Sequence, residues 1–61
     1  MTFIEMLNLK AEYGPEMKIT KAVRLHDEDA WNEYEISYRG CLVGSELVSA
    51  DFVRRLIKNN F

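Results

Sequence analysis

The sequence predicts a small α+β domain in the order helix, three-stranded antiparallel sheet, helix, and three patterns in the chain lead to this prediction. Two runs of alternating apolar and polar residues, 17–25 and 32–38, are joined by a short acidic segment. Stretches with apolar residues at helical spacing precede and follow this pair. Because a period of two is typical of half-buried strands and a period of 3.6 of helices, the chain is interpreted as α-β-β-β-α.

The first helix is expected over residues 3–13. Thr2 and Glu5 have the spacing of a capping box, in which the hydroxyl accepts from a backbone N–H of the first turn and the carboxylate reaches back to the cap. Gly14 can take the left-handed conformation that ends helices, and Pro15 cannot continue one. These signals bound the helix on both sides.

Apolar side chains surround most of this helix, which is more than one small sheet readily covers. Part of the surface is therefore expected to contact a second copy of the chain or another protein, through Met6, Leu9 and Tyr13. The alternative is that the hairpin and the last helix pack on both sides of the first helix. The apolar residues are Phe3, Ile4, Leu7 and Ala11 on one side, with Met6, Leu9 and Tyr13 extending around the cylinder.

The two alternating runs predict an antiparallel hairpin with one buried face. Odd positions of the first run and even positions of the second are apolar, so they share a face if odd residues pair with even ones. Opposite charges and aromatic to β-branched pairs across strands each contribute roughly 0.2–1 kcal/mol. One register with such pairs sets Val23 opposite Tyr34, Ile19 opposite Tyr38, Arg24 opposite Glu33, and Thr20 opposite Ser37.

Lys21 interrupts the apolar row of the first run. We expect its stem to pack on the sheet while its ammonium reaches water past an edge. A partner-facing position or a β-bulge is the alternative.

A tight turn at Tyr38-Arg39-Gly40-Cys41 is expected to lead into a short third strand, because Gly40 supplies the positive φ that hairpin turns need. The strand would cover 41–43 and end at Gly44. As a brief edge strand it limits unwanted pairing, and it is also where a partner could add a strand.

The last helix is expected to begin after Ser49, a good N-cap residue, with a frayed end at 59–60. Basic residues toward its C-terminal end suit the helix dipole. The apolar stripe at helical spacing consists of Phe52, Val53, Leu56 and Ile57, and the basic residues are Arg54, Arg55 and Lys58.

Length and composition predict one domain, residues 1–61, near the lower size limit for independent folding. With 48% hydrophobic and 30% charged residues the chain is globular rather than disordered, and a chain this small often completes its core by forming a homodimer. The formal charge of −2 argues against general affinity for nucleic acid or anionic membranes.

Cys41 is the single cysteine, so an intramolecular disulfide is excluded. No apolar run approaches the ~20 residues of a membrane span, and the start lacks the pattern of a secretory signal. A cytoplasmic location without membrane attachment is expected.

The order helix, three strands, helix is shared with double-stranded-RNA-binding domains, which this chain resembles in topology alone. That family carries a lysine-rich start to its last helix and contacts phosphates and 2′-hydroxyls. Here the helix begins Ser49-Ala50-Asp51-Phe52, with its basic residues a turn later, so the sequence is not identified as a member.

The hairpin loop clusters His26, Asp27, Glu28 and Asp29, residue types that bind metals. Four neighbours on a loop seldom converge, so a solvated turn is the better interpretation. Cys41 with His26 is the only obvious nucleophile and base, without an oxyanion-hole motif, and a cysteine in a short strand is more often a buried hydrophobe. We therefore expect no catalysis, no cofactor, no bound metal and no small-molecule substrate.

The favoured functional hypothesis is an inhibitor or adaptor that occupies a site on a larger protein, as small host-directed proteins of phages and mobile elements do. An acidic end and outer face of the hairpin would steer a basic partner or imitate phosphate spacing. The solvated-loop alternative remains open for these residues taken alone. The predicted acidic contacts are Asp27, Glu28, Asp29, Glu33 and Glu35.

The alternative hypothesis is a nucleic-acid-binding regulator that uses the exposed side of the last helix, through Arg54, Arg55 and Lys58. Such a surface would hold phosphates and give salt-sensitive binding. Against it stand the acidic total and the absence of a helix-turn-helix pattern. Further cations that could join this patch are Lys18, Arg24 and Arg39.

Overall fold

The computed structural model describes residues 1–26 and 29–61, with side chains described for 1–22 and 33–61. It confirms the predicted α+β architecture and its order, with a short 3-10 helix after the first helix. The three strands form one antiparallel sheet in the order β1-β2-β3. The elements are α1 (Phe3–Tyr13), η1 (Gly14–Glu16), β1 (Met17–His26), β2 (Asp29–Tyr38), β3 (Cys41–Ser45) and α2 (Ala50–Asn60).

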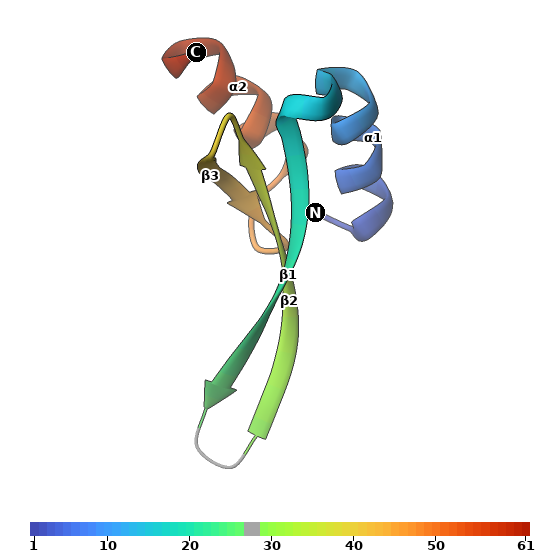
Figure 1. Ribbon diagram of the computed structural model, residues 1–61, viewed down its shortest axis with the longest axis vertical. Helices are drawn as coiled ribbons and strands as arrows, with labels where there is room; N and C mark the ends of the chain where they lie inside the picture. Colours follow the sequence, from blue (N-terminus) through green and yellow to red (C-terminus); the bar gives the residue numbers. More distant parts are fainter. Residues whose placement is uncertain (27–28) are drawn as a thin grey trace.

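The helices lie at one end of the molecule, α1 beside β1 and α2 beside β3, while the β1–β2 hairpin continues beyond them as a two-stranded arm (Figure 1). The arm makes the molecule elongated, with extents of 39 × 20 × 19 Å. β1 and β2 are longer than predicted, since pairing continues to His26 and Asp29. The expected loop over 26–31 is therefore mostly strand.

The hydrophobic core lies between the two helices and one face of the sheet. Ring contacts join the sheet to the end of α1 and to the C-terminus, because the ring centre of Tyr38 lies 5.5 Å from that of Tyr13 and 5.3 Å from that of Phe61. The buried core residues are Met6, Leu9, Met17, Ile36, Tyr38, Val43, Val53 and Ile57.

Both helices begin at the predicted caps. The Glu5 backbone N–H donates to Thr2 Oγ1 at 3.1 Å, and the Thr2 N–H donates to Glu5 Oε1 at 2.9 Å, which completes the capping box. In α2 the Phe52 N–H donates to Ser49 Oγ at 3.1 Å. The expected fraying at 59–60 is wrong, because α2 continues to Asn60.

The turn between β2 and β3 has the predicted positive φ at Gly40 (82°), and Arg39 also has a positive φ (52°), which was not predicted. This combination matches the right-handed twist of a two-residue hairpin. β3 does not end at Gly44 as expected but runs to Ser45, and a bulge opposite Ile36 and Ser37 lies within it.

The hairpin register differs from the predicted one by two residues. Ile19 pairs with Ile36, and Lys21 pairs with Tyr34. A shift of two keeps the described side chains of the hairpin on their predicted faces, because side chains alternate with period two. Each residue of β1 therefore pairs two positions earlier in β2 than predicted, and the last pair is His26 with Asp29. The partners found in place of the four predicted pairs include Thr20 with Glu35, Ala22 with Glu33, Val23 with Asn32 and Arg24 with Trp31.

Candidate functional site

Apart from Leu47 before α2 and Phe61 at its end, the exposed large apolar side chains that the structure describes lie on two surfaces of the molecule. The first, here called the α1 face, consists of Phe3, Ile4 and Leu7, with Ile4 the most exposed at 69%. The second lies along β3 and α2, where Leu42 is 63% and Phe52 49% exposed. Apolar side chains left this open on a small domain often mark interaction surfaces.

The second surface is hollowed into an open groove of about 360 Å³, here called the β3–α2 groove. Apolar side chains make up most of it, and carboxylates stand at its border. Among the lining residues that the structure describes, two are acidic and none is basic. The lining residues are Glu33, Glu35, Leu42, Val43, Gly44, Ser45, Val48, Phe52 and Leu56.

The apolar stripe of α2 is wide enough to serve both the core and the groove. Val53 and Ile57 are buried, while Phe52 and Leu56, each one residue earlier, line the groove. Residues four apart lie on one side of a helix, so the two pairs form adjacent rows. One row anchors α2 and the other remains accessible.

Gly44 lets α2 approach β3 closely. A Cβ at this position would lie 2.6 Å from Val53 Cγ2 and 3.1 Å from Val48 Cγ2, which is too close without movement of these side chains. The missing side chain therefore sets the depth at which Val53 packs beneath the groove.

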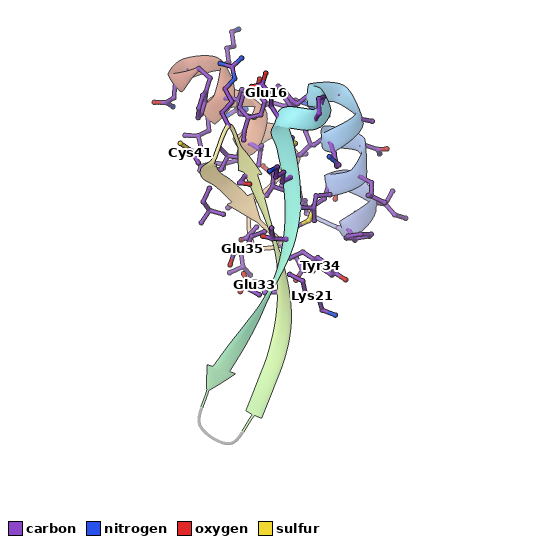
Figure 2. All side chains as sticks on the ribbon, in the orientation of Figure 1. Glu16, Lys21, Glu33, Tyr34, Glu35 and Cys41 are labelled. Atoms are coloured by element: carbon purple, nitrogen blue, oxygen red, sulfur yellow. The ribbon has the colours of Figure 1, made fainter. Side chains whose placement is uncertain are left out.

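Glu33 and Glu35 lie together on the sheet face opposite Tyr34, as the alternation predicts. Figure 2 shows both on the β3 side of the twisted hairpin, with Lys21 and Tyr34 on the other side. Both glutamates are half-buried, and both line the groove. The prediction that they share one surface is therefore confirmed.

The other predicted acidic contacts are not placed. Asp27 and Glu28 lie outside the described residues, and Asp29 is described only as the first residue of β2. Of the five predicted carboxylates, Glu33 and Glu35 are thus the ones on which a site can be built.

Met6 and Leu9 require a correction, because they have no exposed surface and belong to the core. Tyr13 is half-buried against Tyr38. The sheet and α2 cover this side of α1, so the apolar residues left open on α1 are on its other side. The alternative, in which the hairpin and the last helix pack on both sides of the first helix, is therefore not found, since Phe3, Ile4 and Leu7 stay exposed.

Lys21 is exposed, and its Nζ lies 5.8 Å from the ring centre of Tyr34, directly across the ladder. The same ring lies 4.7 Å from that of Phe3. The ammonium therefore interacts with an aromatic face at the border of the core, which accounts for a lysine in the apolar row.

The basic residues predicted to bind nucleic acid are partly engaged with carboxylates. Arg54 Nε lies 3.2 Å from Glu12 Oε2, and Nη1 lies 3.5 Å from Asp51 Oδ1. The hydrogen bond to Glu12 is the main cause that raises the pKa of Arg54. Arg55 and Lys58 are exposed.

Two of the three further cations have described side chains. Arg39 forms an ion pair with Glu16, and the hydrogen bond between them raises the pKa of Arg39. Lys18 is exposed on β1, whereas the side chain of Arg24 lies outside the description.

Cys41 is exposed at the start of β3, so its interpretation as a buried hydrophobe is wrong. The strand edge leaves this side chain open. Within the described part of the chain, no group of three or more His, Cys, Asp or Glu side chains is arranged to hold a metal ion. The side chains of His26 and Asp29 fall outside that part.

Comparison with protein-family models, with curated proteins and with solved structures finds no match to this chain. Among the described residues, no helix has both the length and the apolar character needed to cross a membrane. The function is therefore inferred from the exposed surfaces of the molecule.

The groove was not predicted from the sequence, although the sequence contains a signal for it. Four apolar residues of α2 fall at two adjacent positions in each of two turns, a wider stripe than one small core needs. Leu42 in the edge strand and Gly44 beside it complete the signal, but only the packing of α2 on β3 brings them together.

Proposed function

We propose that this chain is a small, non-enzymatic protein-interaction module that binds a segment of a larger protein in the β3–α2 groove. Inhibitors and adaptors of this size act by occupying a partner's surface, which requires a stable fold and one exposed binding surface. The observation that carries the proposal is the concave apolar surface formed by Leu42, Phe52 and Leu56 beside Glu33 and Glu35.

Burial of apolar side chains supplies most of the binding free energy in such a groove, roughly 25 cal/mol per Å² of apolar surface removed from water. The carboxylates contribute orientation and a faster encounter with a basic partner rather than much affinity. This division of roles supports a protein ligand with apolar anchors and at least one positive charge.

The test is capture of partners from a lysate of the organism that encodes the chain, on the immobilised protein, with and without nuclease. Leu42→Asp is the groove variant, and Ile4→Asp is its matched control, since both replace an exposed aliphatic residue, 63% and 69% open. We expect one protein that survives nuclease and is retained by wild type and Ile4→Asp but lost with Leu42→Asp.

Equal retention by Leu42→Asp would contradict the proposal, as would capture of nucleic acid alone. In the second case Arg55 and Lys58 would become the residues to study, and the alternative nucleic-acid function would replace the proposed one. Charge reversal of Glu33 and Glu35 together should weaken the same capture while the domain stays folded.

A further inference from the structure

We draw no further inference here: the strongest candidate, the outer edge of β3 beside the β3–α2 groove, carries none, because nothing in the described part of the structure shows what covers it.

Discussion

The α1 face consists of successive turns of one helix, whereas the β3–α2 groove is formed where a strand and a helix meet. The two surfaces expose aliphatic residues to a similar degree, 69% at Ile4 and 63% at Leu42. The groove combines its apolar side chains with the edge strand β3 and two carboxylates. Exposed apolar area alone therefore does not define a binding site; the polar groups beside it give direction and selectivity.

The comparison also shows how the two helices divide their apolar residues. α1 places Met6 and Leu9 in the core and leaves Ile4 outside, and α2 places Val53 in the core while Phe52 borders the groove. Each helix thus has an inner and an outer apolar row. Substitutions in the inner row and in the outer row should have different effects, and the largest is expected for the inner row.

Leu9→Asp should unfold the domain, although it lies two residues from the exposed Leu7. A carboxylate buried without a partner costs several kcal/mol, and a chain of this length has only roughly 3–9 kcal/mol of total stability. Leu7→Asp should change the stability by less than about 1 kcal/mol. Thermal unfolding followed by circular dichroism measures both.

A folded Leu9→Asp variant would contradict the placement of Leu9 in the core. It would restore the hypothesis that this side of α1 faces a second copy, which the mass of the wild-type protein in solution would then have to support.

Gly44→Ala should destabilise the domain by about 1–3 kcal/mol, because the new methyl group displaces Val53 from beneath the groove. In a double-mutant cycle with Val53→Ala, the two changes should couple by about 1 kcal/mol or more, since removal of Val53 Cγ2 makes room. Gly40→Ala is the control. It meets no neighbour within 4 Å, and its cost, about 1–2 kcal/mol, comes from its positive φ.

Additive effects of Gly44→Ala and Val53→Ala would show that α2 does not approach β3 closely at this point. Gly40→Ala should remain additive with Val53→Ala in the same urea titrations.

Thr2→Ala and Ser49→Ala should each cost about 1 kcal/mol, because each removes the side-chain acceptor at the start of a helix. The two capped helices differ in their relation to the groove, because α2 contributes Phe52 and Leu56 to its described lining and α1 contributes no residue. Loosening the start of α2 should also weaken binding in the groove, whereas loosening α1 should not. Equal losses of binding affinity would mean that the groove depends on the whole fold rather than on α2.

Glu5 gives the smallest effect and a distinct pH dependence. The hydrogen bond from the Thr2 backbone N–H is the main cause that lowers the pKa of Glu5 below its ordinary value of 4.5. A lowered folded-state pKa contributes stability that is present above the unfolded value and is lost as the pH falls through the folded value. The stability difference between wild type and Glu5→Gln should therefore shrink as the pH drops below 4.5.

Urea unfolding at a series of pH values measures this difference. If the difference were the same at every pH, the carboxylate would not be the group that completes the cap of α1.

Local signals explain why much of the fold could be predicted. Thr2, Glu5 and Gly14 act within one or two turns of chain, so the bounds of α1 follow from the sequence. Alternation between core and surface likewise decides the faces of the hairpin, even though its register differs by two residues. These features depend on neighbours in the chain.

The site depended on contacts between distant residues, which spacing does not reveal. Whether Met6 or Ile4 enters the core is decided by the angle at which α1 crosses the sheet, since both belong to one broad apolar surface. The pairing of Arg54 with Glu12 joins residues 42 positions apart. The groove likewise required the packing of Phe52 and Leu56 beside Leu42.

The most direct test of the central claim is methyl NMR of the isotope-labelled chain during titration with the protein captured from lysate. The account predicts that the methyl signals of Leu42 and Leu56 shift on binding, while those of Ile4 and Leu7 do not. Shifts at Ile4 and Leu7 with none at Leu42 and Leu56 would contradict it and assign binding to the α1 face.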